Sequence, residues 1–219
     1  MTSKAIIFDM DGVLIDSEPL WKIAEIEGFA KVGLDVTAKS LEESVGLRID
    51  EVVKIWHSKY KWTNKTVEEV TDDIVDILIR EINTQGKALP GVVEVLKKLK
   101  NQNYKIGLAT SSYQRIVDAV LNKLNIAQYF DVCHSAEFEK HGKPHPAVFM
   151  TTADKLGVKH TNCLVIEDSL NGVIAAKAAR MKVIAVPEKS HAHNPKLMVA
   201  DKIIDNLNEF KINWMEELD

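Results

Sequence analysis

The sequence predicts an α/β protein in which a doubly wound parallel sheet, covered by helices on both faces, carries a helical insert after its first strand. Two observations lead to this prediction. Short apolar runs alternate with helical patterns along most of the 219 residues, and one long stretch near the N-terminus carries helical patterns alone. Strands that alternate with helices of this length are typical of parallel sheets, because each helix supplies a crossover connection.

Four apolar runs are expected to form the central strands, since they lack the polar alternation of a half-buried strand. They are residues 4–8, 105–109, 163–167 and 182–186. Two weaker strand candidates lie near Val132 and Lys202. Between the strands, apolar positions at helical spacing predict helices over residues 92–102, 116–124, 146–156 and 170–181.

The stretch from about residue 18 to residue 83 breaks this alternation, because it holds four helical patterns and no convincing strand. The four helices are expected to begin near Glu18, Ser40, Ile49 and Thr66. Ser17 is expected to cap the first of them, with Pro19 tolerated in its first turn.

The insert divides the chain into two expected domains. Residues 84–91 look like a return linker, after which the strands and helices of the sheet resume. We therefore expect a core domain of residues 1–16 and 86–219 and an α-helical cap domain of residues 17–85.

Composition and charge argue against several classes of function. The chain has 28 basic and 32 acidic residues, and the resulting net charge of −4 is unlike that of a nucleic-acid-binding surface. No apolar run approaches the length of a membrane span, and the N-terminal apolar segment is too short for a signal peptide. Cys133 and Cys163 are expected to be buried free thiols, which favours a reducing cytoplasm. Nothing in the sequence points beyond a monomer.

Carboxylates, hydroxyls and one lysine fall at or beyond the predicted carboxyl ends of the strands. Open parallel sheets bind their ligands beyond those ends, so these groups are expected to converge on one rim. In chain order they are Asp9, Asp11, Thr110, Ser111, Ser112, Lys143, Glu167 and Asp168.

A divalent cation would relieve the repulsion among carboxylates packed on such a rim. Mg²⁺ prefers hard oxygen ligands, and Asp9, Asp168 and Glu167 are suitable, although Glu167 could instead only position the ligands. A hydroxyl from Thr110 and a fixed charge from Lys143 would then hold a phosphoryl group.

Two closely spaced aspartates suit a two-step transfer of that phosphoryl group. Asp9 can attack phosphorus as a nucleophile once the charge of the phosphate is screened. Asp11, two residues farther on, can protonate the leaving alcohol and later accept the proton of the attacking water.

These motifs resemble the signature motifs of the haloacid dehalogenase superfamily, and the resemblance runs over nearly the whole chain. It lies in DMDGVLIDSE, in Thr110-Ser111 after IGLA, in Lys143 of GKPHP, and in EDSLNG. The resemblance implies a Rossmann-like core, a helical cap that closes over the substrate, Mg²⁺, and an aspartyl-phosphate intermediate.

The resemblance also implies roles for single residues. Asp9 would be the nucleophile and a metal ligand, and Asp11 the general acid/base and a ligand through its backbone carbonyl. Phosphate would be held by Thr110, Ser111 and Lys143, and the metal would be anchored by Glu167 and Asp168.

Within the superfamily, the chain is similar to the β-phosphoglucomutase and sugar-phosphatase branch. SEPLW and VGLRID look like segments of the 2-deoxyglucose-6-phosphate and hexitol phosphatases. In this branch the second segment faces the active site, so Arg48 is a candidate contact for sugar hydroxyls or a second anionic group. Trp21 is a candidate for lining the cleft, with packing inside the cap as the alternative.

The expected activity is Mg²⁺-dependent hydrolysis of small sugar or sugar-alcohol phosphates of the hexose 6-phosphate type. A β-phosphoglucomutase-like phosphomutase is the alternative, but the mutase pattern has a histidine at the position of Trp21. Dehalogenases lack an acid at the position of Asp11, which argues against dehalogenation. A receiver-type signalling domain would lack both the helical insert and a carboxylate placed like Asp11.

Overall fold

In the part of the chain that the structure describes, six parallel strands form one sheet in the order β3-β2-β1-β4-β5-β6. The strands are β1 (Ala5–Phe8), β2 (Lys105–Thr110), β3 (Val132–Ser135), β4 (Cys163–Glu167), β5 (Lys182–Ala185) and β6 (Lys202–Ile203). The computed structural model describes residues 4–41, 47–187 and 194–217. The predicted α/β fold with a parallel sheet is confirmed, and the two weaker strand candidates are its outer strands β3 and β6.

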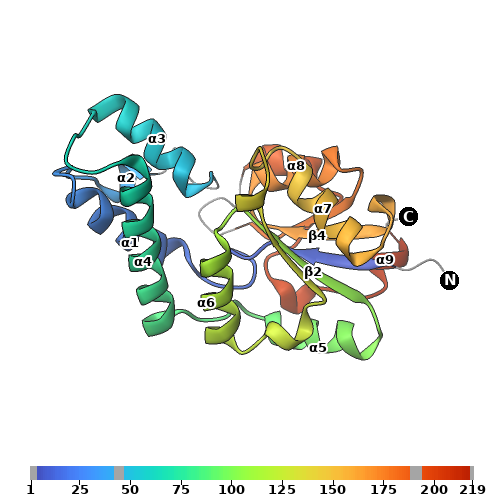
Figure 1. Ribbon diagram of the computed structural model, residues 1–219. Helices are drawn as coiled ribbons and strands as arrows, with labels where there is room; N and C mark the ends of the chain where they lie inside the picture. Colours follow the sequence, from blue (N-terminus) through green and yellow to red (C-terminus); the bar gives the residue numbers. More distant parts are fainter. Residues whose placement is uncertain (1–3, 42–46, 188–193, 218–219) are drawn as a thin grey trace.

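Helices cover both faces of the sheet (Figure 1). They are α5 (Val92–Asn101), α6 (Gln114–Leu124), α7 (Ala147–Leu156), α8 (Leu170–Ala178) and the short α9 (Trp214–Glu217). Single turns of 3-10 helix are η2 (Ala127–Tyr129), η3 (Ala136–Phe138), η4 (His160–Asn162), η5 (Pro195–Val199) and η6 (Leu207–Glu209). Helices α6, α7 and α8 come after strands β2, β3 and β4, as the alternating pattern of the sequence predicts, whereas α5 follows the return linker from the insert.

The central strand β1 has no solvent-facing side, which explains its unbroken apolar sequence. Ile6 and Phe8 point into the core beneath α5 and α6, whereas Ala5 and Ile7 point into the core beneath α7 and α8. Successive side chains of a strand alternate between faces, so a strand covered on both sides is apolar at every position.

The helical insert lies to one side of the sheet, at the end opposite the N-terminus in Figure 1. Its helices are α1 (Glu18–Ala30), α2 (Ala38–Leu41), α3 (Ile49–Tyr60) and α4 (Val67–Gln85). Helix α4 begins with a capping box in which Thr66 and Glu69 bond each other's backbone N–H groups. Helices α1 and α4 pack so closely that a Cβ on Gly28 would lie 2.2 Å from Ile74 Cγ1.

Three expectations about boundaries and caps differ from the structure. Helix α4 continues through Gln85, so the return linker begins at Gly86 instead of residue 84, and α8 ends at Ala178. Ser17 stands at the N-cap position of α1, but its hydroxyl makes no capping hydrogen bond. That hydroxyl donates to Asp11 instead, because the carboxylate is a stronger acceptor within reach.

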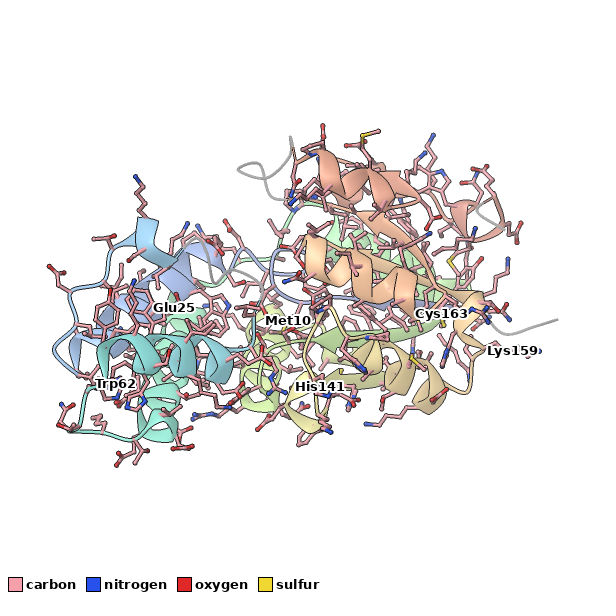
Figure 2. All side chains as sticks on the ribbon, turned by 90° about the horizontal axis from the view of Figure 1, so that it is seen from above. Met10, Glu25, Trp62, His141, Lys159 and Cys163 are labelled. Atoms are coloured by element: carbon pink, nitrogen blue, oxygen red, sulfur yellow. The ribbon has the colours of Figure 1, made fainter. Side chains whose placement is uncertain are left out.

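Cys133 and Cys163 are free thiols, as predicted, but only Cys163 is buried and Cys133 is partly exposed. Figure 2 shows Cys163 at the end of the sheet away from the insert, which carries Glu25 and Trp62. Among the described residues, no helix combines the length and the apolar character that crossing a bilayer requires.

Candidate active site

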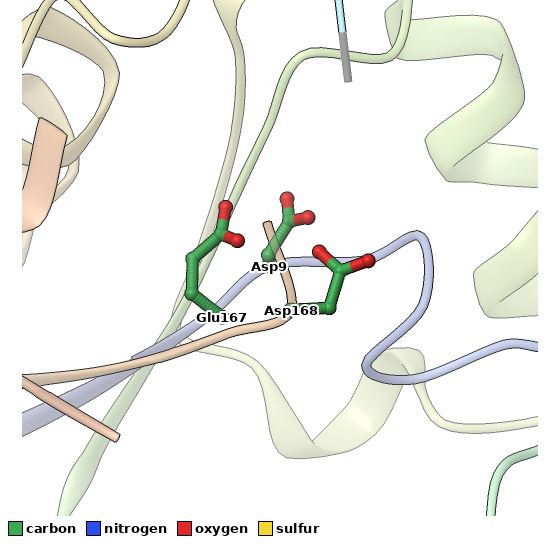
Figure 3. Close-up of side chains that lie close together, drawn as sticks. All are labelled: Asp9, Glu167 and Asp168. Atoms are coloured by element: carbon green, nitrogen blue, oxygen red, sulfur yellow. The ribbon is translucent and has the colours of Figure 1, made fainter. Parts of the chain in front are cut away.

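Three carboxylates meet where neighbouring strands end. Strand β1 lies between β2 and β4, so the residue after Phe8 lies beside the carboxyl end of β4. One oxygen from each of Asp9, Glu167 and Asp168 lies within 4.8 Å of the others, and Figure 3 shows the three side chains side by side. The strand-end argument from the sequence therefore brings these three groups together.

A cavity of about 1000 Å³ lies over this rim, between the sheet and the helical insert. Its walls include nearly every predicted site residue: Asp9, Asp11, Trp21, Thr110, Ser111, Lys143, Glu167 and Asp168. Helix α1 lines the cavity with Glu18, Trp21, Lys22 and Glu25. Neighbours in this set are three or four residues apart along the chain or directly adjacent, so the four side chains share one face of the helix.

Lys143 links two of the carboxylates. Its ammonium group donates to Asp9 Oδ1 at 2.8 Å and to Glu167 Oε1 at 2.7 Å, and it is almost completely buried. Burial acts to lower the pKa of Lys143, but the charges of Asp9 and Glu167 outweigh that effect and raise it. Lys143 is therefore a permanently charged group fixed beside Asp9.

One buried cation cannot neutralise the whole cluster. Burial, with the charges of Glu167 and Asp11, raises the pKa of Asp9 to about 7 against the opposing effect of Lys143. Burial, with the charges of Glu167 and Asp9, raises the pKa of Asp168 well above its usual range. Ionising both aspartates is therefore unfavourable until a further positive charge arrives. Closely grouped carboxylate oxygens are the donor set that fits Mg²⁺.

Both carboxylate oxygens of Glu167 accept hydrogen bonds from the protein. Oε1 accepts from Lys143, and Oε2 accepts from the backbone N–H of Ser169 at 2.7 Å and from its hydroxyl at 3.0 Å. A Cβ on Gly172 would lie 1.7 Å from Oε1, so the first turn of α8 admits only glycine there. These contacts favour the reading in which Glu167 positions Lys143 and the loop of Asp168.

Asp11 points into a set of three donors. Oδ1 accepts from the Ser17 hydroxyl at 2.6 Å and from Trp21 Nε1 at 3.0 Å, and Oδ2 accepts from the Ser112 hydroxyl at 2.6 Å. Sequence reasoning placed Ser112 at a strand end without giving it a role, and assigned Ser17 to helix capping. Only the folded structure, in which the hydroxyls of Ser17 and Ser112 both reach Asp11, shows that both hold it.

The turn directly after Asp11 requires glycine for two reasons. Gly12 has a φ of 71°, in the left-handed region that glycine adopts without strain. A Cβ there would lie 2.2 Å from Asp168 Oδ2. The loop after β1 thus packs directly against the loop after β4.

Two hydroxyl side chains at the end of β2 complete the rim. Thr110 Oγ1 accepts from the backbone N–H of Ser112 at 3.1 Å, which leaves its own proton free to donate. The buried hydroxyl of Ser111 has no hydrogen-bond partner among the described residues. An unpaired buried hydroxyl beside a cavity is suited to a ligand oxygen.

Arg48 does not line the cavity, contrary to what its place in VGLRID suggests. Its Nη1 donates to the carbonyls of Ala136 and Glu139, both at 3.0 Å, and its Nε donates to Asp50 at 3.1 Å. The guanidinium is therefore used to tie α3 to the loop after β3. The first residues of this segment, Val45 and Gly46, lie outside the described residues.

Comparison with known proteins gives the family. The description "haloacid dehalogenase-like hydrolase" applies to the family that matches residues 6–186. The chain belongs to this family. Hexitol phosphatase B of Escherichia coli (strain K12) is 40% identical over 206 residues, which cover 94% of this chain and 93% of that protein.

Two further matches agree with this assignment. The phosphorylated carbohydrates phosphatase of Thermotoga maritima is 35% identical over 83% of each chain. A crystal structure of β-phosphoglucomutase from Clostridium difficile superposes with a TM-score of 0.83 at 29% identity, covering 99% of this chain and 96% of the other. The chain belongs to a hydrolase family and its relatives are named as phosphatases, which supports its assignment as a phosphoric monoester hydrolase.

Proposed function

We propose that the protein is a Mg²⁺-dependent phosphatase that hydrolyses small sugar or sugar-alcohol phosphate monoesters through an aspartyl-phosphate on Asp9. The observation that carries the proposal is the contact of Asp9 with Lys143, beside Asp168 and two residues from Asp11. A nucleophile, a fixed cation, a set of metal ligands and a separate proton carrier are then together in one cavity.

In the first step, an oxygen of Asp9 forms a bond to phosphorus as the bond from phosphorus to the substrate oxygen breaks. Asp11 gives its proton to the departing alkoxide, so the product leaves as a neutral alcohol. Lys143 holds one phosphoryl oxygen, and the hydroxyls of Thr110 and Ser111 donate to the others. The unpaired Ser111 hydroxyl supports this last assignment.

In the second step, Asp11 takes a proton from a water molecule, which attacks phosphorus and breaks its bond to Asp9. Free Asp9 and inorganic phosphate result, and Asp11 again carries a proton. Asp9 and Asp168, with the backbone carbonyl of Asp11, would hold Mg²⁺, which when bound neutralises charge on the phosphoryl oxygens. Glu167 keeps Lys143 in place through its 2.7 Å contact.

The substrate class follows from the cavity wall and from the relatives. We assign residues 17–85 the role of a cap domain, which supplies Trp21 and Glu25 to the side of the cavity that faces the rim. Two relatives carry names that specify hexitols or phosphorylated carbohydrates as substrates. We therefore propose that the substrate is a monophosphate of a hexose or a hexitol.

The alternative, a phosphomutase, is less well supported. A mutase must house a second phosphoryl group in the same cavity, and a cation would be needed for it. Among the described residues that line the cavity, the lysines are Lys143 and Lys22, and no arginine is present. Lys22 is paired with Glu18 at 3.1 Å, and Arg48 is used elsewhere. Hydrolysis is therefore the better reading.

We also propose that the protein acts as a monomer in the cytoplasm. The two free cysteines support a reducing compartment. Size-exclusion chromatography with light scattering would test the oligomeric state.

Phosphate release tests the proposed function. Purified protein with Mg²⁺ is expected to release phosphate from hexitol and hexose 6-phosphates, and Asp9→Asn is expected to abolish release. A bisphosphate-primed assay with β-glucose 1-phosphate separates the alternative, since a mutase would yield glucose 6-phosphate without net phosphate loss. Full turnover by Asp9→Asn would contradict the assignment of the nucleophile.

A further inference from the structure

Glu25 is an acidic side chain on the cavity wall to which the mechanism gives no role. It lies on α1 one helical turn beyond Trp21, on the stripe that faces the cavity, and Figure 2 marks it on the helical insert. Four residues of α-helix rise about 6 Å, so Glu25 lies about that much farther along the helix axis from the N-terminal end of α1 than Trp21 does.

Among the residues that the structure describes, the side chain of Glu25 has no bonding partner. Within the described residues, no hydrogen bond or ion pair to it is found, whereas the neighbouring Lys22 is paired with Glu18 at 3.1 Å. Burial, followed by the charge of Glu18, raises the pKa of Glu25 to about 8, with Lys22 opposing. A carboxyl group in this state can both donate and accept hydrogen bonds.

The surroundings of Glu25 make this lack of a partner costly. The other insert residues that line the cavity include the apolar side chains of Leu41, Leu47 and Ile49. Glu25 is half-buried, and a half-buried polar group without a protein partner is destabilising unless a ligand supplies hydrogen bonds. Hydroxyl groups of a polyol or sugar would supply them, because neighbouring hydroxyls can donate to a carboxylate or accept from a carboxylic acid.

We propose that Glu25 is a specificity-determining residue that hydrogen-bonds hydroxyl groups of the substrate's carbon chain while the phosphoryl group lies at Asp9. This inference rests on the proposed function and adds the group that recognises the part of the substrate beyond the phosphate. A site built to bond hydroxyls discriminates strongly against an analogue that lacks them.

The test compares one substrate with hydroxyls and one without. The ratio of kcat/KM for sorbitol 6-phosphate to kcat/KM for n-hexyl phosphate is measured in the parent protein and in Glu25→Leu and Glu25→Gln. We expect Glu25→Leu to lower this ratio by about tenfold or more. Glu25→Gln is nearly isosteric and keeps one acceptor and one donor group, so it should lower the ratio less.

Glu27→Gln is the matched control, because Glu27 lies on the same helix but is exposed and paired with Arg80 at 2.9 Å. Its ratio should equal that of the parent. If the parent hydrolyses sorbitol 6-phosphate, an unchanged ratio in Glu25→Leu would overturn this inference and leave the proposed function standing. A parent protein that hydrolyses neither substrate would contradict the proposed function and the inference together. If Glu25→Leu fails to fold, as judged by its melting curve, Glu25→Ala takes its place, and an unchanged ratio in Glu25→Ala would overturn the inference in the same way.

Discussion

The indole of Trp21 donates a hydrogen bond to Asp11 across 3.0 Å, from the helical insert to the rim of the sheet. An indole N–H can only donate, so Oδ1 of Asp11 must act as an acceptor in this arrangement. The hydroxyl of Ser112, which contacts Oδ2, can donate or accept. The proton that Asp11 carries during catalysis is therefore expected on Oδ2, with Trp21 as the positioning residue.

Trp21→Phe tests this arrangement, because it keeps an aromatic ring and removes the donor. We expect kcat to fall by about tenfold, the value of one hydrogen bond to a charged group, with a smaller change in KM. Steady-state kinetics on p-nitrophenyl phosphate would measure both. An unchanged kcat, with a change in KM alone, would show that Trp21 contacts substrate and does not position Asp11.

Lys143→Met tests whether Lys143 balances the buried carboxylates. Removing the cation leaves Asp9 and Glu167 buried without it, and we expect the free energy of unfolding to fall by about 3 kcal/mol at pH 8. The loss should be smaller at pH 5.5, since protonated carboxyl groups need no cation. Urea unfolding at the two pH values measures this. Lys159→Met, at an exposed site, is the control, and an equal loss in both variants would refute the explanation.

Gly12→Ala tests the contact between the two loops. The new Cβ would lie 2.2 Å from Asp168 Oδ2, so we expect Asp168 to move and activity to be lost. Gly33→Ala is a matched control, since Gly33 also has a positive φ of 78° but no atom within 4 Å of the added Cβ. It should cost about 1 kcal/mol in stability and leave kcat intact. Equal activity in the two variants would argue against a role for the loop contact.

The metal-free protein should lose stability as its clustered carboxylates ionise. The pKa of Asp9 is about 7 in the folded chain against 3.8 for an unperturbed aspartate, so the folded chain binds this proton more tightly. The free energy of unfolding therefore falls, on account of this group, as the pH rises from about 4 to about 7.

Mg²⁺ competes with those protons, so it should raise the melting temperature more at pH 8 than at pH 5.5. Thermal unfolding with and without Mg²⁺ at both pH values measures the difference. In the double variant Asp9→Asn, Asp168→Asn, Mg²⁺ should no longer raise the melting temperature at either pH. An increment that is independent of pH would mean that the ion binds elsewhere.

The sequence predicted the rim of the sheet well, because strand adjacency depends on patterns that the sequence shows. Once 4–8, 105–109 and 163–167 are taken as parallel strands, the side chains that follow them must lie on one edge. Asp9, Thr110 and Glu167 were found in this way. The helices were found because their apolar positions recur at helical spacing, although their ends shifted by a few residues.

The contacts across the cavity could not be predicted in the same way. Arg48 bonds carbonyl groups of Ala136 and Glu139, which are 88 and 91 residues away, and no local pattern gives the angle at which the insert meets the sheet. The roles of Ser17 and Ser112 depend on the same angle. Glu25 did leave a signal, since it lies four residues after Trp21 and so shares its face of the helix.

The central claim is that Asp9 carries the phosphoryl group during turnover. Acid quenching of the protein during hydrolysis of a sugar phosphate, followed by mass analysis of its peptides, tests this claim most directly. We predict that the peptide containing Asp9 gains the mass of one phosphoryl group, and that this gain is absent without substrate and in Asp9→Asn. A rapidly turning-over enzyme with an unmodified Asp9 peptide, or with the phosphoryl group on another residue, would contradict the account.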